Sequence, residues 1–503
     1  MKAKKLFSVL LAALMVSVCF TACGGDEETN KSDVTQGPQD TSVEESYFIP
    51  DTKYDDQEFT VLANTDDGEW TNNNFFVEED SDDPVNSAIY RRQKLIEEEF
   101  GVKFKVLEGV TRGSVNDYVS TSVKSDTKEY DLVVNSINHM YTLAQSDCLT
   151  PLDEITHLDI TSDAWDQSML SQTSIAGANY FATGEITVVD NDATWVMMFN
   201  KTLAKSVGIG EGDLKSIYDL VKDNEWTLDK LLEYCKLFTY QDLDASGTTT
   251  HLDQFPIATT IDFITGLYYG TNSRIIHKDS ADIPYLKELD DTTVKLVDKI
   301  AEIYTASNQY TFDCHDYMSI NPAVHLLSQA MFEEDRALFY SEVMQCVTRL
   351  RDMDTDFGII PVPKADKNQK NYTTHSVAIV TMVAGVPKDI SYDENRLALS
   401  GMIMQALAVE GKNILTPAYY EASLIGKGTR DEESADMLPI IFANRVVDLG
   451  SIVDDQNVTS ISNSLIDAIK SNSTGKLSSL FARNKTKVNA ALEDLVEKFT
   501  AVK

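Results

Sequence analysis

Residues 85–106 have the sequence VNSAIYRRQKLIEEEFGVKFKV, and residues 58–63 before them have the sequence EFTVLA. In 85–100 the apolar residues recur at helical spacing, and Gly101 follows where a helix would end. In 102–106 apolar residues alternate with lysines, as in a strand, and 58–63 has the composition of a buried strand. Strand, helix and strand in this order predict a βαβ unit with parallel strands. The expected fold class is therefore α/β.

A second apolar run, YDLVV at 130–134, ends in the polar turn NSIN at 135–138. Because α/β folds bind ligands at the carboxyl ends of their parallel strands, this turn is expected to face a ligand. Further along, helical spacing marks 228–238, with Thr227 as N-cap. Strand character returns at 337–340, 357–361 and 376–380, and the chain ends in helical patterns. Two α/β lobes, each built from discontinuous pieces, would explain this order.

The amino-terminal end has the composition of a signal peptide. Three lysines precede an apolar run at 6–20, and small residues then lead to Cys23. The run is shorter than the about 20 apolar residues that a permanent transmembrane span needs. Here the chain resembles bacterial lipoproteins, although Phe20 stands where that family usually has Leu. The resemblance implies that 1–22 is a signal peptide and that Cys23 carries a lipid; an ordinary secreted protein is the alternative.

Composition limits the partners of the chain. Residues 24–46 are acidic and polar, so we expect 23–46 to be a flexible tether, with structure beginning near Tyr47. The whole chain has 43 Lys and Arg against 80 Asp and Glu, a net charge of −37. That charge repels phosphate backbones and anionic headgroups, so no nucleic-acid partner is expected and the lipid alone would hold the protein at a membrane. Four later cysteines lack Cys-x-x-Cys spacing, and both disulfides and buried thiols are open for them.

Seven short motifs are distributed along the chain within residues 55–450. They are YDLV (130–133), LTPLD (149–153), TWVMMFNK (194–201), WTLDKL (226–231), RALFY (336–340), DFGIIPVPK (356–364) and YYE (419–421). Together they resemble the extracellular solute-binding proteins of bacterial ABC importers, in particular the sugar-type family 1 lipoproteins of Gram-positive bacteria. The resemblance implies the type II periplasmic-binding-protein fold, in which two α/β lobes joined by crossing segments close on a ligand. It also implies a monomer at the outer face of the membrane that delivers a carbohydrate, in particular an oligosaccharide, to an ABC permease.

The expected lobes are assembled from four pieces. Lobe 1 would comprise 47–190 and 343–418, and lobe 2 would comprise 191–342 and 419–503. The first crossing is expected within 185–200, where an Asp-rich piece passes directly into a buried strand. By analogy with the family, the other two crossings are expected near 338–343 and 417–421.

Candidate ligand-binding residues lie near these crossings and at loop ends. Carbohydrate sites combine aromatic faces, which stack on sugar rings, with carboxylates and amides that bind hydroxyls. The aromatic candidates are Trp195, Tyr340, Tyr419 and Tyr420, with Trp70 and Trp165 on the lobe 1 side. The polar candidates are Asn191, Asp192 and Glu342. For each aromatic residue, packing in the core or between the lobes is the alternative.

Residues 242–253, DLDASGTTTHLD, follow the spacing of an EF-hand calcium loop. The expected ligands are Asp242, Asp244, Ser246, Thr248 and Asp253, with Gly247 at the sharp turn. A plain polar loop is the alternative, because Ser246 replaces an acid and Asp253 is shorter than the usual Glu. Apart from this structural calcium, no cofactor is expected.

The sequence contains none of the enzyme motifs that we searched for. His-Glu-x-x-His, Gly-x-Ser-x-Gly and the phosphate-binding Gly-x-x-x-x-Gly-Lys are absent. We therefore expect no catalytic activity. Because the pairing of two catalytic carboxylates is spatial, a cell-surface glycoside hydrolase stays open as the alternative, followed by a non-catalytic adhesin or structural lipoprotein.

Overall fold

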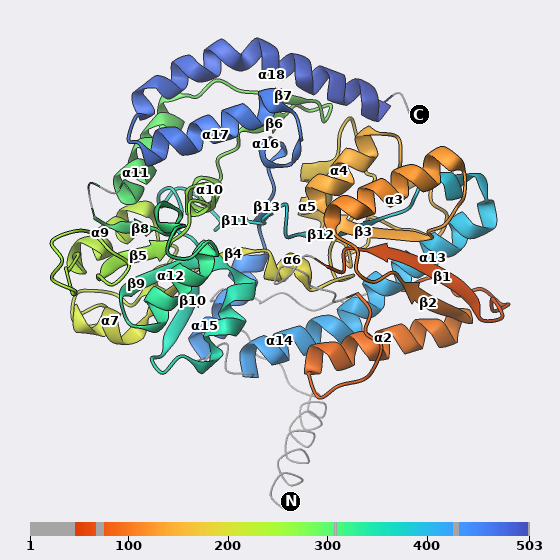
Figure 1. Ribbon diagram of the computed structural model, residues 1–503, viewed down its shortest axis with the longest axis horizontal. Coiled ribbons are helices and arrows are strands. Elements are labelled where there is room, and N and C mark those ends of the chain that lie inside the picture. The colour runs from red at the N-terminus through yellow and green to blue at the C-terminus, as the bar shows by residue number, and fades with distance from the viewer. Residues whose placement is uncertain (1–45, 67–74, 306, 308, 426–431, 501–503) are drawn as a thin grey trace, which may run out of the picture. The chain divides into compact units, whose positions relative to one another are not determined.

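The computed structural model describes residues 46–503 apart from 67–74, 306, 308, 426–431 and 501–503 (Figure 1). Two β-sheets, each covered by helices, form the cores of two lobes. The expected α/β class, with two lobes made of discontinuous pieces, is confirmed. Cys23 and Trp70 lie outside the described residues, so the expectations for them stay predictions.

Lobe 1 is built on a four-stranded sheet of order β12-β3-β1-β2. Strand β1 (Gln57–Ala63) pairs in parallel with β2 (Val102–Val106) and β3 (Leu132–Ser136), and β12 (Met382–Gly385) is antiparallel to β3. Helix α2 (Pro84–Phe100) connects β1 to β2, which confirms the predicted βαβ unit. The sheet is covered by α2, α3 (Arg112–Ser125), α4 (Ile137–Gln145) and α13 (Glu394–Glu410).

Local sequence explains both ends of α2. The Asp83 carboxylate accepts hydrogen bonds from the backbone N–H groups of Val85 and Asn86, which have no partner within the helix. Gly101 has a φ of 67° and ends the helix in the left-handed region. A Cβ atom there would lie 2.7 Å from the Lys53 Cβ, so glycine is required by both backbone and space.

Lobe 2 is built on a five-stranded mixed sheet of order β10-β4-β9-β5-β8. Strand β5 (Phe255–Thr259) is parallel to β8 (Thr311–Asp313) and β9 (Ala337–Val343). Strand β4 (Trp195–Asn200) is antiparallel to β9 and to β10 (Phe357–Ile360). The main helices of this lobe are α8 (Ile217–Lys222), α9 (Leu228–Leu237), α10 (Phe263–Gly270), α11 (Asp291–Tyr304), α12 (Val324–Glu333) and α15 (Glu432–Phe442).

Three segments run between the two sheets. The first contains α6 (Val189–Asp192) and lies within the expected crossing at 185–200. The second contains β11 (Thr374–His375), which leads back to β12 of lobe 1. The third contains β13 (Arg445–Val446), which pairs in parallel with β11. Two crossings are therefore joined by backbone hydrogen bonds.

These positions correct the expected lobe boundaries. Residues 338–343 lie in β9 inside the second sheet, and β10 pairs with β4, so the chain stays in lobe 2 until β11. Residues 417–421 lie in α14 (Thr416–Ile425), which packs on α2 of lobe 1, whereas the next described helix, α15, packs on β10 of lobe 2. The chain therefore changes lobes after α14, and β13, between the two sheets, comes later still. The expectation failed because β10 adds an antiparallel edge strand to lobe 2, a pairing that local sequence does not reveal.

The predicted strand at 376–380 is also wrong. Residues 378–380 form a turn between β11 and β12, and Ile379 is exposed. Val377, Ile379 and Val380 line a cavity instead of a sheet core. An apolar run can therefore mark a wall of a cavity as well as a strand.

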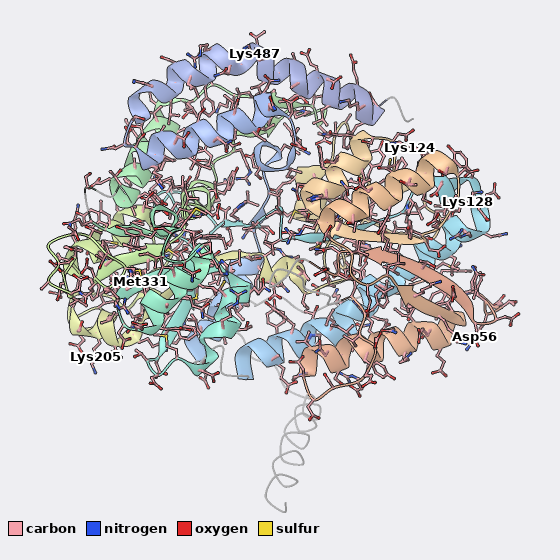
Figure 2. The ribbon with its side chains drawn as sticks, viewed as in Figure 1. Asp56, Lys124, Lys128, Lys205, Met331 and Lys487 are labelled. Carbon is pink, nitrogen blue, oxygen red and sulfur yellow. The ribbon has the colours of Figure 1, made fainter. Side chains whose placement is uncertain are left out.

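The carboxyl-terminal helices connect the lobes a further time. Helix α18 (Leu477–Thr500) packs on α17 (Gln456–Lys470) and on β7 (Pro284–Leu286). At its end Phe499 is buried against the rings of Tyr141 and Tyr180 of lobe 1, and the Tyr180 hydroxyl donates to the Phe499 carbonyl at 3.0 Å. The exposed Lys487 points outward from the same helix (Figure 2). The segment 419–503 thus contacts both lobes.

The remaining elements are short. The four cysteines among the described residues are buried and form no disulfide. Along the described residues we find no helix with the length and apolarity that crossing a membrane requires. The short elements are η2 (Leu152–Glu154), α5 (Gln167–Thr173), α7 (Lys201–Ser206), β6 (Ile276–Lys278), η4 (Cys314–Tyr317), η5 (Met344–Asp352), η6 (Asp389–Tyr392), η7 (Gly411–Leu415), α16 (Leu449–Ile452) and η8 (Thr474–Lys476).

Candidate ligand-binding cleft

The carboxyl ends of parallel strands from both lobes border one cavity of about 290 Å³. Lobe 2 contributes residues that follow or end β5, β8 and β9, and lobe 1 contributes Arg112 at the start of α3. The turn after β11 closes the cavity with apolar side chains. The full lining is Arg112, Trp195, Thr260, Asp262, His315, Val324, His325, Glu342, Val343, Val377, Ile379 and Val380.

A second cavity, of about 300 Å³, lies between lobe 1 and the carboxyl-terminal helices. Its lobe 1 wall consists of Asn116, Asn138, His139 and Thr142, and α16, α17 and the residues between them form the other wall. Asn138 belongs to the polar turn that the sequence predicted to face a ligand. Asn135 of the same turn donates to the Arg112 carbonyl at 3.0 Å and to the Asn116 amide oxygen at 3.2 Å. This side chain therefore links residues of the two cavities.

Two carboxyl groups from lobe 2 form the acidic part of the first cavity. Glu342, near the end of β9, is 5% exposed and accepts a hydrogen bond from the Val343 N–H at 3.1 Å. Burial, followed by the like charge of Asp262, raises the pKa of Glu342 to about 8. Asp262 is exposed to the cavity, but surrounding protein raises the pKa of its carboxyl as well, and His315 opposes that shift. At neutral pH Glu342 therefore retains a proton in the free protein.

Trp195 and Glu342, both predicted from sequence, line this cavity, but the Trp195 ring is part of a packed wall. Its indole N–H donates to the Ser341 hydroxyl at 2.8 Å, and the residue is 1% exposed. A Cβ atom at Gly266 would lie 2.6 Å from the indole, so glycine is what allows the close packing. Tyr340 is completely buried and packs on Phe332 in the lobe 2 core.

The other predicted residues that the structure describes lie at the crossings or inside a lobe. The Tyr419 hydroxyl donates to the Asp192 carboxylate at 2.9 Å, and both residues are buried. Burial raises the pKa of Asp192 to about 6, and this hydrogen bond opposes the rise. Tyr420 packs edge-on against Tyr419. Trp165 is buried in lobe 1, where its indole N–H donates to Gln405.

Sequence reasoning missed several cavity residues. Thr260 and Asp262 come just after the end of β5, as the polar stretch 135–138 spans the end of β3, so the rule that found the turn in lobe 1 could have found them. Arg112, Asn116 and His139 carry no comparable local signal. Their proximity depends on how α3 and α4 pack at the end of β3.

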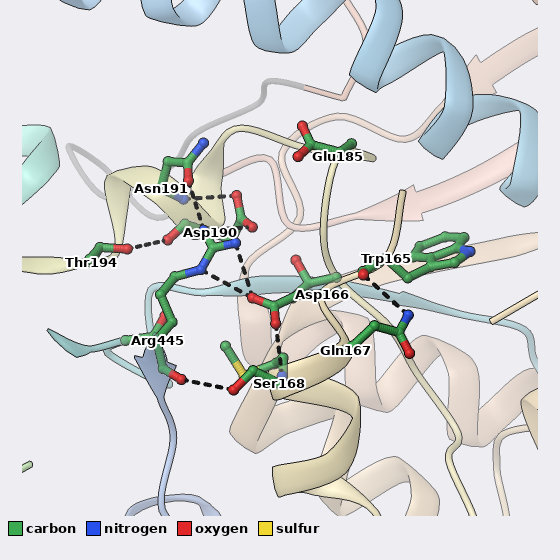
Figure 3. A network of polar contacts seen from close by, with 12 residues as sticks. Trp165, Asp166, Gln167, Ser168, Glu185, Asp190, Asn191, Thr194 and Arg445 are labelled. Carbon is green, nitrogen blue, oxygen red and sulfur yellow. Dashed lines mark hydrogen bonds and ion pairs between the residues drawn. The ribbon is translucent and has the colours of Figure 1, made fainter. Parts of the chain in front are cut away.

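A buried arginine joins the first and third crossings to lobe 1 (Figure 3). Arg445 of β13 contacts Asp166 at 3.0 Å and Asp190 at 2.9 Å, and it donates to Asn191 at 2.7 Å. Asp166 is the N-cap of α5, and the other two partners lie on α6. Burial raises the pKa of Asp190 to about 7 although Arg445 opposes the rise. The predicted ligand residue Asn191 is thus engaged in holding the crossings together.

The predicted calcium loop brings its three acids together. Carboxylate oxygens of Asp242, Asp244 and Asp253 lie within 4.8 Å of one another. Each acid also accepts hydrogen bonds within the loop: Asp242 and Asp244 from the Ser246 N–H, and Asp253 from the Leu243 and Thr250 N–H groups. The Ser246 hydroxyl donates to the Thr248 carbonyl. These bonds account for the loop without a metal, so the calcium stays a prediction.

We predict that Arg445→Met lowers the free energy of unfolding by about 3–5 kcal/mol, because it leaves buried carboxylates without a cation. Without Arg445, Asp190 would bind its proton more tightly in the folded state, so stability would fall as pH rises from about 5 to 8. Denaturant unfolding should therefore show a smaller loss at pH 5 than at pH 8. The control is Arg91→Met on the exposed side of α2. A loss equal to that of the control, or the same loss at both pH values, would contradict the account.

Searches of protein-family models and of curated proteins find no match to the sequence. Solved structures of similar fold do exist. A maltose-binding periplasmic protein from Listeria monocytogenes in complex with maltose has 13% sequence identity and a TM-score of 0.52, with 87% of this chain and 99% of that chain covered. A cyclic α-maltosyl-1,6-maltose binding protein from Arthrobacter globiformis has 13% identity and a TM-score of 0.52, with coverages of 89% and 99%.

A cyclo/maltodextrin-binding protein complexed with maltotetraose is similar to the same degree. It has 13% identity and a TM-score of 0.51, and the match covers 89% of this chain and 97% of that chain. The matches cover nearly all of the three neighbours, so the likeness extends to both lobes and their crossings. The chain therefore shares the two-lobed α/β fold of these binding proteins.

Proposed function

We propose that the protein is the substrate-binding component of an ABC importer. It captures a carbohydrate, in particular an oligosaccharide, between its lobes and delivers the carbohydrate unaltered to the permease. The observation that carries the proposal is a pair of polar cavities bordered by lobe 1 and by lobe 2 or the carboxyl-terminal helices, beside the carboxyl ends of parallel strands. Structural neighbours with the same fold have maltose or maltotetraose bound, which supports the choice of ligand class.

The chemistry of the cavities suits a sugar. Amide, hydroxyl, imidazole and carboxyl groups line them, and each of these groups can bind sugar hydroxyls. Valine and isoleucine side chains in the first cavity offer apolar contact to the C–H groups of a sugar ring. A ligand held by both walls binds the closed state more tightly than the open state and thereby favours closure.

We favour a non-catalytic binding protein over a glycoside hydrolase. The three neighbours of similar fold are described as binding proteins, and the sequence contains no catalytic motif that we searched for. Asp262 and Glu342 are nevertheless two carboxyl groups at one cavity. Product analysis is therefore part of the test below.

We predict that thermal-shift and calorimetric screens will find an oligosaccharide that raises the melting temperature and is recovered intact. Asn138→Ala should weaken its binding by up to about tenfold, because one hydrogen bond contributes about 0.5–1.5 kcal/mol. Asn395→Ala, on the exposed surface of α13, is the matched control and should leave binding unchanged. Tight binding of peptides or polyamines with no sugar response would overturn the carbohydrate proposal, and product formation from any glycan would overturn the transport proposal.

The lipid anchor is proposed from the sequence around Cys23, which lies outside the described residues. A lipid with more than one acyl chain is sufficient for stable attachment. We predict that Cys23→Ala releases the protein from the membrane fraction into the culture medium, whereas Cys19→Ala does not. Fractionation followed by immunoblotting measures this, and membrane retention of the Cys23→Ala protein would rule out the anchor.

A structural calcium in the loop 242–253 is a separate proposal. Because calcium would bind only the folded state, it would add about 2.7 kcal/mol of stability at a concentration 100 times its dissociation constant. We predict that a chelator lowers the melting temperature and that Asp242→Asn abolishes this response. Asp213→Asn, another exposed lobe 2 position, should retain the response. A melting temperature that does not change with chelator would favour the plain loop.

A further inference from the structure

The first cavity has a charged part and an apolar part. Asp262 and Glu342 supply its carboxyl groups, both from lobe 2. Valine and isoleucine side chains from α12, from the end of β9 and from the turn after β11 form the apolar part. Two acids therefore lie beside an apolar wall, and the like charge of Asp262 raises the pKa of Glu342.

Basic side chains also surround this pair. His315, on η4, accepts a hydrogen bond from the Ile261 N–H at its Nδ1. His325 on α12 and Arg112 on α3 line the same cavity, and Arg349 on η5 acts on Glu342 from outside it. The charge of Arg349 lowers the pKa of Glu342 and so moderates the acidic part of the cavity.

A buried hydroxyl lies in the same part of the cavity. Thr260, directly after β5, is 2% exposed and lines the cavity. Its Oγ1 lies beside the Glu342 carboxyl but makes no hydrogen bond of normal geometry. Since buried hydroxyl groups are nearly always paired, this oxygen is placed to bind a ligand beside the Glu342 carboxyl.

No aromatic ring face among the lining residues is exposed to this cavity for stacking on a sugar. Trp195 is the one aromatic residue among the lining residues, and its ring is packed in the wall. Recognition must therefore depend more on charge and hydrogen bonds than on ring faces.

We propose that the carbohydrate captured by this cleft carries a cationic amino group, which lies against Asp262 and Glu342 with Thr260 as a further partner. The proposal rests on the function proposed above and names the ligand class within it. Closure of the lobes would remove water from the two carboxylates, and charges in a dry site are costly unless a counter-charge accompanies them. An ammonium group supplies that charge and three hydrogen-bond donors, whereas a neutral hydroxyl supplies no charge.

Proton release is the consequence that can be measured. In the free protein Glu342 has a pKa of about 8, raised by burial and by Asp262, so it is largely protonated at pH 7. An ammonium group binds the ionised form and therefore displaces this proton. Affinity for an amine should rise by up to about tenfold per pH unit while pH stays below the pKa of the sugar amine, and it should level off above that pKa as the amine loses its own proton. A neutral sugar should show no such rise.

The test is calorimetry with matched oligosaccharides of two to four units: β-1,4-linked glucosamine, N-acetylglucosamine and glucose. Titrations in buffers of different ionisation enthalpy report proton release. We expect the glucosamine series to bind at least tenfold more tightly than the other two at pH 6, where the sugar amine is still protonated, with proton release. Glu342→Gln should remove most of that preference and the proton release, whereas Glu333→Gln, on the exposed side of α12 in the same lobe, should retain both.

Asp262→Asn provides a second variant that does not depend on replacing a buried side chain, and it too should reduce the preference for the amine. Equal or tighter binding of the neutral series, or an amine preference that survives both variants, would overturn the amino-sugar proposal and leave the carbohydrate function standing. Failure of all three series, together with no response in the wider sugar screen, would overturn both.

Discussion

The pairing of Arg445 with Asp166 and Asp190 is the interaction on which the arrangement of the lobes depends. Its guanidinium is buried where β13, α6 and the start of α5 meet, so one side chain fixes two crossing segments against lobe 1. Burying several charges together costs desolvation free energy, which is offset only when each charge has a well-placed partner. Removing one partner leaves the other buried charges without compensation. Such a network favours the arrangement of the crossings in which all of its partners are satisfied.

Two further connections act together with this network. Backbone hydrogen bonds join β11 to β13, so the second and third crossings form a small parallel pair. Helix α18 packs on lobe 2 for much of its length and ends with Phe499 between two tyrosines of lobe 1. A closing motion must therefore occur by small rotations in the crossings, while the Phe499 contact either moves with lobe 1 or breaks. Both cavities lie where such rotations would change the distance between their walls.

Much of the fold could be predicted from local sequence. The helix at 85–100, its end at Gly101 and the polar turn at the end of β3 were predicted correctly, because local sequence determines each of them. The lobe boundary at 343 was wrong because β10 joins lobe 2 through a pairing with β4, which only the folded chain reveals. The run at 376–380 was wrong because an apolar wall of a cavity and a buried strand have the same composition.

The candidate site was harder to predict than the fold. An aromatic residue near a crossing can stack on a sugar or pack in the core, and the local sequence looks the same in both cases. Tyr340 and Trp165 are both buried. Glu342 was identified, but its partner Asp262 was not, because their proximity depends on β5 and β9 lying side by side. The sequence therefore indicated the correct fold and the correct strand ends more reliably than the residues of the cavity.

The central claim is that two lobes close on a carbohydrate, and small-angle X-ray scattering of the mature protein tests it most directly. The radius of gyration would be measured without ligand and with a saturating oligosaccharide chosen by calorimetry, with a non-binding isomer as control. The account predicts a smaller radius with the bound oligosaccharide and no change with the isomer, because the ligand favours the closed state. An unchanged radius with the ligand demonstrably bound would contradict closure of the lobes as the mode of capture.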